Sequence, residues 1–182
     1  RRDRFTRGRY IMAQDFWKND YLMQKKFLEL SVIVIGDVGL DVNYVVNDDH
    51  RVSPENRSLK IRDAIEINYS PGAAGNIAMC LSNLGIDTTV IAPAAENDIN
   101  WGIVSSIMSK LGGINVVRVS GRPIPVYSKA VTVSGEQVDR IDYVSRPHSK
   151  SDSNALNDTL LELLSELGRD ASNTAIVVAD YE

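Results

Sequence analysis

The chain has 182 residues, of which 43% are hydrophobic and 24% are charged, and its formal net charge is −4. This size and balance fit one globular domain, or one domain with an appendage. The net negative charge gives no indication of nucleic-acid binding, which uses a basic face. The sequence contains no run of about 18 apolar residues, the length needed to span a membrane. The single cysteine, Cys80, cannot form an internal disulfide and favours a reducing compartment, so we expect a cytoplasmic protein.

Residues 1–30 are predicted to form a basic arm and a helix. The segment from Arg1 to Tyr10 contains five arginines and one aspartate. Such an arm either contacts phosphate or an acidic partner, or it is a leader outside the folded domain, with Met12 as a candidate natural start. Between Asp15 and Leu30, apolar residues recur at spacings that favour a helix with an apolar face. That helix would pack on its own domain or on a second chain.

Residues 31–182 are predicted to form the folded body, which begins with a strand. The run Ser31 to Ile35 is rich in β-branched residues and is typical of a strand buried on both faces. It ends in Gly36-Asp37, and Asp41 follows four residues later. A carboxylate just past the C-terminal end of a buried strand lies where open α/β sheets bind ligands. Asp37 is therefore a candidate ligand contact, and the alternative is an aspartate that forms a salt bridge or caps a helix.

The segment of residues 71–78 reads Pro-Gly-Ala-Ala-Gly-Asn-Ile-Ala and is predicted to be a glycine turn before a helix. Glycine lets the backbone turn sharply and approach a bound molecule, and the first amides of a helix can face a ligand. Asn76 both donates and accepts hydrogen bonds, which suits a ligand rich in hydroxyl groups. The alternative is a turn that serves packing alone. The helix is expected to end at Gly85 and to bury Cys80.

The rest of the body alternates between strands and helices. Further core strands are predicted at Thr88–Ala92, where Pro93 would end the strand, at Ile114–Val119 and at Ala175–Ala179. Helices are predicted from the apolar positions between Ile99 and Leu111 and between Leu156 and Leu167, the second with its cap in Ser151–Asn154. Buried strands that alternate with helices predict an α/β protein with a three-layer parallel sheet and right-handed crossovers.

Two segments do not follow this alternation. Residues 42–69 contain half-exposed strands, with Pro54 marking an edge or a loop between them, and residues 126–143 read as a β-hairpin with a polar face. Both segments leave the ligand end of the predicted main sheet. They are therefore expected to build a separate small sheet that covers this end as a lid.

Five short motifs suggest a relationship to a known family. They are Val-Ile-Gly-Asp-Val-Gly-Leu-Asp (34–41), Arg-Val-Ser-Pro-Glu (51–55), Pro-Gly-Ala-Ala-Gly-Asn-Ile-Ala (71–78), Gln-Val-Asp-Arg-Ile-Asp (137–142) and Ala-Asp-Tyr (179–181). In this order and spacing, the chain resembles the ribokinase-like (PfkB-type) carbohydrate kinases, and most closely the D-glycero-β-D-manno-heptose 7-phosphate kinase domain. The resemblance spans residues 32–181. It implies a partial ribokinase-like three-layer fold with a small β-lid.

The resemblance implies a site for a sugar phosphate. Asp37 matches the family aspartate that binds sugar hydroxyls, and Gly72 and Asn76 match the glycine turn that lines the sugar pocket. Arg140 takes the lid position that meets the substrate, where its fork would grip a phosphate in two places. We add two further candidates for substrate binding, Asp41 and Ala73. Ala73 stands where the family has the second of two glycines, so it places a methyl group where the sugar approaches.

The resemblance also implies what lies outside the chain. The family's second half holds the ATP and Mg²⁺ sites and the catalytic aspartate, so we expect no catalytic, nucleotide-binding or metal-binding residue in this chain, which reads as truncated. A separate C-terminal half would then be a partner.

Two functions follow from these expectations. The first is ATP-dependent phosphoryl transfer to a heptose 7-phosphate or a related sugar, with this chain supplying the sugar-binding half. The alternative is a non-catalytic binding or assembly module that keeps the fold. Under either function, a homodimer through the lid strands or the N-terminal helix is expected.

Overall fold

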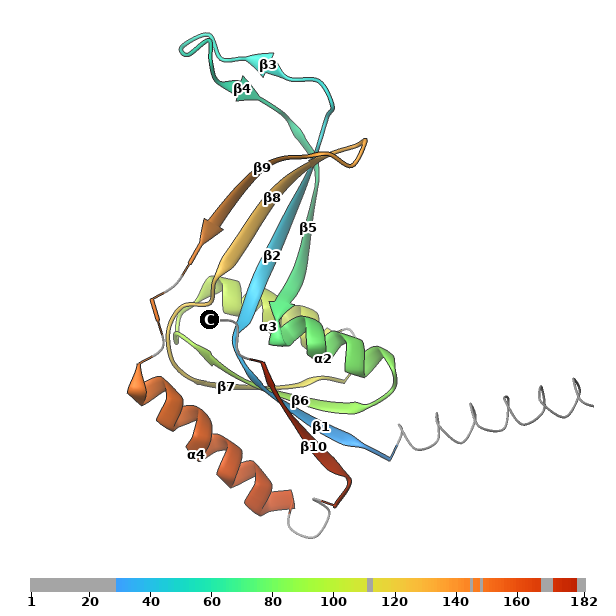
Figure 1. The fold of residues 1–182 in the computed structure, drawn as a ribbon, viewed down its shortest axis with the longest axis vertical. Coiled ribbons are helices and arrows are strands. Elements are labelled where there is room, and N and C mark those ends of the chain that lie inside the picture. The colour runs from blue at the N-terminus through green and yellow to red at the C-terminus, as the bar shows by residue number, and fades with distance from the viewer. Residues whose placement is uncertain (1–28, 111–112, 145, 148, 168–171, 180–182) are drawn as a thin grey trace, which may run out of the picture.

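The computed structural model describes residues 29–110, 113–144, 146–147, 149–167 and 172–179. Its centre is a four-stranded parallel sheet with the strand order β10-β1-β6-β7. The strands are β1 (Ser31–Gly36), β6 (Asp87–Ala94), β7 (Asn115–Ser120) and β10 (Thr174–Ala179). Together with a second four-stranded sheet, they confirm the predicted α/β fold class (Figure 1).

Helices cover both faces of the parallel sheet. The helices are α2 (Ala74–Asn83), α3 (Ile99–Lys110) and α4 (Lys150–Leu167). Because side chains alternate along a strand, Val34 packs in the cluster that contains Ala78 of α2 and Met108 of α3. Its neighbour Ile33 packs in the cluster that includes Leu160 of α4. The result is the three-layer order predicted from the sequence.

Only small residues of α2 are buried, and Cys80, which was expected to be buried, is not among them. The buried residues are Ala74, Gly75 and Ala78. Cys80 is exposed, although the apolar surroundings in the sequence predicted a buried thiol. Small residues four positions apart are enough to seat this helix close to the sheet, and Cys80 lies two positions away from that row.

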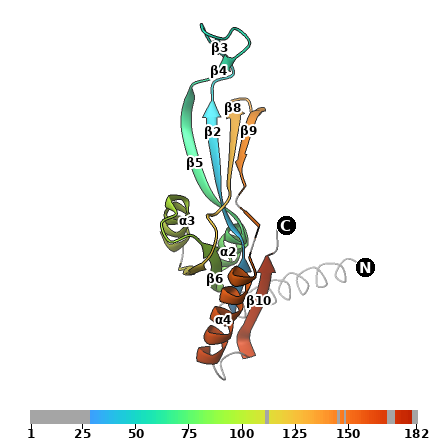
Figure 2. The ribbon, with the colours of Figure 1, turned by 90° about the vertical axis from the view of Figure 1, so that its left-hand side faces the viewer.

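The second sheet, called the lid sheet here, projects from the C-terminal end of the parallel sheet (Figures 1 and 2). Its strand order is β5-β2-β8-β9, with a parallel central pair flanked by antiparallel pairs. The strands are β2 (Val38–Val46), β5 (Ala64–Ala73), β8 (Val126–Thr132) and β9 (Gln137–Tyr143). A short hairpin of β3 (Arg51–Val52) and β4 (Lys60–Ile61) lies at its tip.

The strand register gives the lid sheet one apolar and one polar face. Paired positions place five large apolar side chains on the first face: Tyr44, Ile67, Tyr69, Ile141 and Tyr143. The same register places polar and charged side chains on the second face, among them Asp41, Asn43, Asn68, Lys129 and Arg140.

Three element boundaries differ from the predictions. Strand β2 begins at Val38, so Asp41 lies inside a strand of the lid sheet rather than in a loop. Strand β6 continues through Pro93, which pairs with Val119 of β7. Pairing of β6 with β1 stops at Ile91, so Pro93 has a neighbouring strand on one side only and its missing N–H breaks no ladder there.

The third boundary is the start of α4. The reciprocal cap is made by Ser149 and Asp152, where the sequence predicted a cap within residues 151–154. The basic arm and most of the N-terminal helix predicted for residues 1–30 lie outside the described residues, as do Asp180 and Tyr181. Of the helices that the structure describes, none has the length and apolar character needed to cross a membrane.

Candidate functional site

Asp37 lies at the junction of β1 and β2, at the C-terminal edge of the parallel sheet. Its side chain is 10% exposed and pairs with Arg122, whose side chain is 5% exposed. Arg122 Nη2 donates to Asp37 Oδ2 at 2.8 Å. Asp37 therefore forms a salt bridge, the alternative that the sequence left open. A carboxylate has about four acceptor positions, so this bond does not preclude further hydrogen bonds to a ligand.

Ala73, the residue that joins β5 to α2, has a backbone conformation that favours glycine. Its φ is +51° and its ψ is −123°, and it is the one non-glycine residue with positive φ among those described. The amide that follows, of Ala74, donates to the carbonyl of Asp37 at 2.8 Å. The turn thus brings the start of α2 against Asp37, and it does so at a position where a Cβ is unfavourable.

The two glycines of the turn serve close packing. A Cβ at Gly75 would lie 2.6 Å from Pro71 Cβ, and a Cβ at Gly72 would lie 3.2 Å from Asp41 Oδ2. The sequence predicted that glycines make the sharp turn, whereas the positive φ in this segment occurs at Ala73. Asp41 and Gly72, both predicted site residues, are therefore direct neighbours on the lid sheet.

Arg140 lies on the same polar face as Asp41 and is held by its own strand. Its Nε lies 2.8 and 2.9 Å from the two carboxylate oxygens of Asp142, and its guanidinium carbon lies 5.8 Å from the centre of the Tyr127 ring. The hydrogen bond and charge of Asp142 raise the pKa of Arg140 above its ordinary value, with smaller contributions from Asp41 and Tyr127. About half of its side chain remains exposed, so the guanidinium is accessible to an anion.

Asn76 is exposed in the first turn of α2, and no side chain caps this helix. The predicted residues therefore fall into two groups. Asp37, Ala73 and Asn76 lie where β1 meets α2, and Asp41, Gly72 and Arg140 lie on the polar face of the lid sheet. Their use in substrate binding stays a prediction.

The sequence did not single out Arg122, which lies two residues after β7 in the turn to β8. One signal could have found it: a charged residue after a buried parallel strand lies at the same sheet edge as Asp37.

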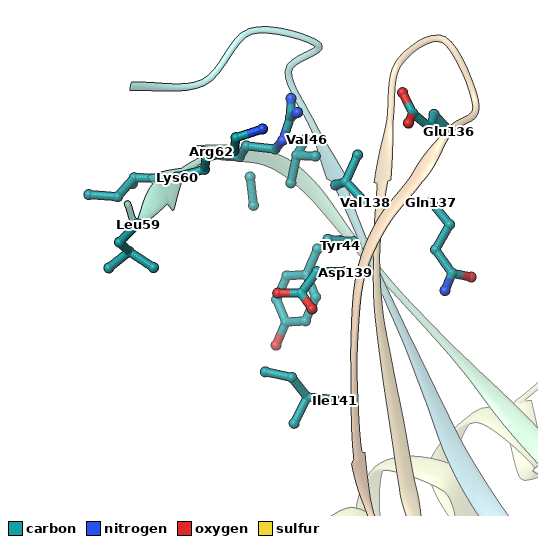
Figure 3. A pocket seen from close by; sticks show the side chains of 13 residues that line it. Tyr44, Val46, Leu59, Lys60, Arg62, Glu136, Gln137, Val138, Asp139 and Ile141 are labelled. Carbon is teal, nitrogen blue, oxygen red and sulfur yellow. The ribbon is translucent and has the colours of Figure 1, made fainter. Parts of the chain in front are cut away.

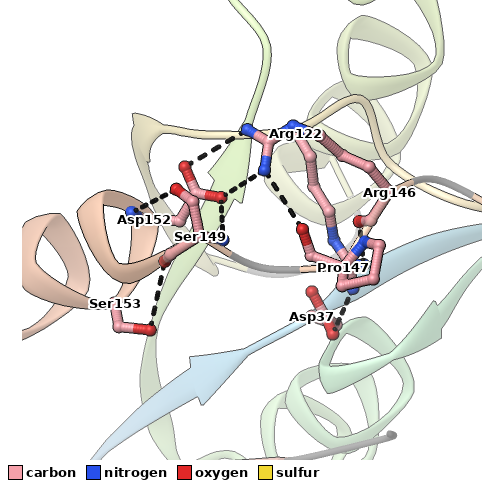
Figure 4. A network of polar contacts seen from close by, with 7 residues as sticks. All are labelled: Asp37, Arg122, Arg146, Pro147, Ser149, Asp152 and Ser153. Atoms are coloured by element: carbon pink, nitrogen blue, oxygen red, sulfur yellow. Dashed lines mark hydrogen bonds and ion pairs between the residues drawn. The ribbon is translucent and has the colours of Figure 1, made fainter.

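Arg122 also contacts the segment that leaves the lid sheet (Figure 4). Its Nη1 donates to the carbonyl of Arg146, and the guanidinium of Arg146 donates to Asp152 Oδ2 at 2.9 Å. Asp152 in turn accepts from the amide of Ser149 at 2.8 Å. The hydrogen bond from Arg146 is the main cause that lowers the pKa of Asp152 to about 2. A continuous polar network thus runs from Asp37 to the start of α4.

A groove of about 700 Å³ lies elsewhere, on the apolar face of the lid sheet. Figure 3 shows it between the strand that carries Tyr44, the strand that carries Ile141, and the tip hairpin with Leu59. It is thus on the opposite face of the sheet from Asp41 and Arg140. In the described part of the chain, no three or more His, Cys, Asp or Glu side chains gather to hold a metal ion.

Comparison with curated proteins finds relatives over most of this chain. It is 28% identical over 156 residues to the bifunctional protein HldE of Marinomonas sp. strain MWYL1, covering 85% of this chain and 31% of that protein. It is 30% identical over 153 residues to HldE of Hyphomonas neptunium, covering 82% of this chain and 29% of that protein. The chain thus spans about a third of the length of the curated relatives that it matches. No family model matches it.

Solved structures share its fold. A carbohydrate kinase from Agrobacterium tumefaciens superposes with a TM-score of 0.52 at 16% identity, over 82% of this chain and 53% of that one. A possible 1-phosphofructokinase from Thermotoga maritima superposes with a TM-score of 0.54 at 20% identity, over 81% of this chain and 44% of that one. At these identities the likeness shows the fold.

Proposed function

Because this chain is homologous to the ribokinase-like carbohydrate kinases and shares their fold, we propose that it binds a sugar phosphate where the lid sheet meets the C-terminal edge of the parallel sheet. The proposed reaction of the full-length protein is transfer of the γ-phosphate of ATP to the anomeric hydroxyl of a heptose 7-phosphate or a related sugar. The described residues would supply the sugar side of that reaction.

The observation that carries this proposal is the position of Asp37. Its carboxylate is buried at the C-terminal end of the first parallel strand, and its backbone carbonyl accepts a hydrogen bond from the amide of Ala74 at the start of α2. Open α/β sheets bind ligands at this edge. A carboxylate that accepts hydrogen bonds beside an uncapped helix start suits the alternating donors and acceptors of a sugar.

The polar face of the lid sheet supports the phosphate end of the proposal. Asp41 would accept hydrogen bonds from further sugar hydroxyls. In the bonds described, Asp142 accepts from Arg140 Nε, so Arg140 would bind the phosphate through its two terminal nitrogens. A guanidinium with two further nitrogens matches phosphate geometry. When bound, ATP with Mg²⁺ would supply the phosphoryl group and neutralise its charge. The described residues would orient the sugar and exclude water from it.

One observation favours the non-catalytic alternative. Ala73 combines an unfavourable positive φ with a methyl group where the family has glycine. A non-catalytic module does not require the sugar to lie directly against the backbone at residue 73, so it would tolerate this methyl group. Absence of sugar-phosphate binding would rule out the first function and leave the assembly module.

We further propose that the apolar face of the lid sheet pairs with a second copy of the chain. Ile67, Ile141 and Tyr143 are 46%, 69% and 54% exposed on this face. Such a row of large apolar residues on one face of an open sheet favours a partner surface. A twofold arrangement would place the same face of each copy in contact with the other.

Isothermal titration tests the proposed function. The wild-type protein is titrated with heptose 7-phosphate, ribose 5-phosphate and fructose 6-phosphate, alongside Asp37→Asn and Asp87→Asn. Asp87 is an exposed aspartate at the opposite end of the parallel sheet and serves as the matched control. We expect heat with at least one sugar phosphate, its loss in Asp37→Asn and its retention in Asp87→Asn. Absence of heat at millimolar concentrations of all three sugars would overturn the proposal.

A further inference from the structure

The chain passes between the parallel sheet and the lid sheet four times, after β1, β5, β7 and β9. Asp37 is the link between β1 and β2, and its carbonyl accepts from the first amide of α2, the helix that follows β5. Its carboxylate accepts from Arg122, which follows β7. Arg122 in turn donates to the carbonyl of Arg146, which lies between β9 and α4. Hydrogen bonds of Asp37 and Arg122 therefore connect all four passages.

The bonds to Asp37 and to the Arg146 carbonyl come from the two terminal nitrogens of one guanidinium. Arg122 places Nη2 on Asp37 and Nη1 on the carbonyl of Arg146 (Figure 4). A lysine has a single nitrogen on a flexible stem and does not reproduce this pair of directions. Arg122 is also almost fully buried, so that water competes little for either bond.

We infer that Arg122 is a positioning residue, which orients Asp37 for the substrate hydroxyl groups and joins that carboxylate to the segments that hold β8 and β9. The inference rests on the proposed function as far as the sugar is concerned. Arg122 itself does not touch the sugar in this arrangement. Its effect on binding passes through the orientation of Asp37 and through the placement of the lid sheet above it.

The physical reason is the cost of separating the pair. A buried carboxylate that loses its cationic partner keeps its desolvation without compensation. It then turns toward solvent or draws in water, and the acceptor directions set for the sugar are lost. The segment beyond β9 loses its bond to Arg122 at the same time, because the Arg146 carbonyl loses that donor.

Three variants separate these roles by titration with the sugar phosphate that the wild-type protein binds. Arg122→Met removes both bonds and keeps the side-chain length, so Kd should rise about tenfold or more. Arg122→Lys keeps the charge beside Asp37, and Kd should recover to within about fivefold of the wild-type value. Arg146→Gln is the matched control, because it keeps the backbone carbonyl of Arg146 to which Arg122 Nη1 donates. Its Kd should stay within about twofold of the wild-type value.

Amide hydrogen exchange gives a readout that needs no sugar. The amide of Leu40 bonds to the carbonyl of Pro125, and the amide of Ala74 bonds to the carbonyl of Asp37. In Arg122→Met, both amides should exchange faster than in the wild-type protein, while amides in the middle of α4 stay unchanged. Arg146→Gln should leave the Leu40 and Ala74 amides as they are.

The outcomes can be told apart. Unchanged sugar affinity in a folded Arg122→Met protein overturns the inference, and so does a Kd in Arg122→Lys that is no better than in Arg122→Met. If Arg122→Met does not fold, the comparison of Arg122→Lys with Arg146→Gln decides. If the wild-type protein binds no sugar phosphate, the proposed function fails, and exchange at Leu40 and Ala74 alone decides whether Arg122 holds the four passages together.

Discussion

Replacing Ala73 with glycine should stabilise the protein, whereas glycine in place of alanine inside a helix destabilises it. At φ +51° and ψ −123°, a residue with a Cβ is strained by about 1–3 kcal/mol. Glycine removes this strain but adds about 0.4–1 kcal/mol of conformational entropy to the unfolded chain. The difference is a net gain of about 1 kcal/mol. For a chain of this length, a gain of that size raises Tm by about 2–4 °C.

Thermal and urea unfolding followed by circular dichroism measure this gain. Ala78→Gly is the matched control, since Ala78 is fully buried in the middle of the same helix. Its replacement should lower stability by about 1 kcal/mol or more, because glycine is a poor helix former and the methyl contact is lost. If Ala73→Gly destabilises the protein as much as Ala78→Gly does, the strain at Ala73 is absent and this reasoning is refuted.

Two further predictions concern the network at α4 and the lid sheet. The pKa of Asp152 is lowered to about 2 from an ordinary value near 3.8, so its ionised form stabilises the folded state above about pH 4, and this contribution is lost as pH falls toward 2. Asp152→Asn should therefore cost about 1–2 kcal/mol in urea unfolding at pH 7, a figure reduced for the half-exposed Arg146, and less at pH 3; an equal cost at both pH values would contradict the assignment. Ile141→Asp should convert a dimer to a monomer in light scattering, whereas Asn68→Asp, on the polar face, should not; a wild-type monomer at high concentration would remove the proposed pairing.

The core strands and the lid could be predicted from the sequence because their signals are local. A run such as residues 31–35 has β-branched residues on both faces, which only a strand between two layers requires. The hairpin of β8 and β9 is indicated by the alternation of apolar and polar residues on either side of Gly135, whose φ is +92°. Both signals depend on nearest neighbours in sequence, and the structure confirms both.

Features set by distant partners were not predictable in this way. Pro93 was read as the end of a strand, since the sequence does not show that β1 stops pairing with β6 at Ile91. The exposure of Cys80 depends on which side of α2 meets the sheet. Arg122 and Asp37 are 85 residues apart, and only the fold brings them together. Asp37 and Asn76 were located by their positions in the predicted sheet and turn, the other candidate residues by family motif, and the contacts of all of them came from the structure.

The most direct test of the central claim is titration of the wild-type protein and Asp37→Asn with heptose 7-phosphate. The claim is that Asp37, at the end of β1, anchors a sugar phosphate beneath the polar face of the lid sheet. We predict saturable heat with the wild-type protein, none with Asp37→Asn, and an unchanged isotherm with Asp87→Asn. Equal binding by the wild-type protein and Asp37→Asn would contradict the claim, because the sugar would then bind elsewhere.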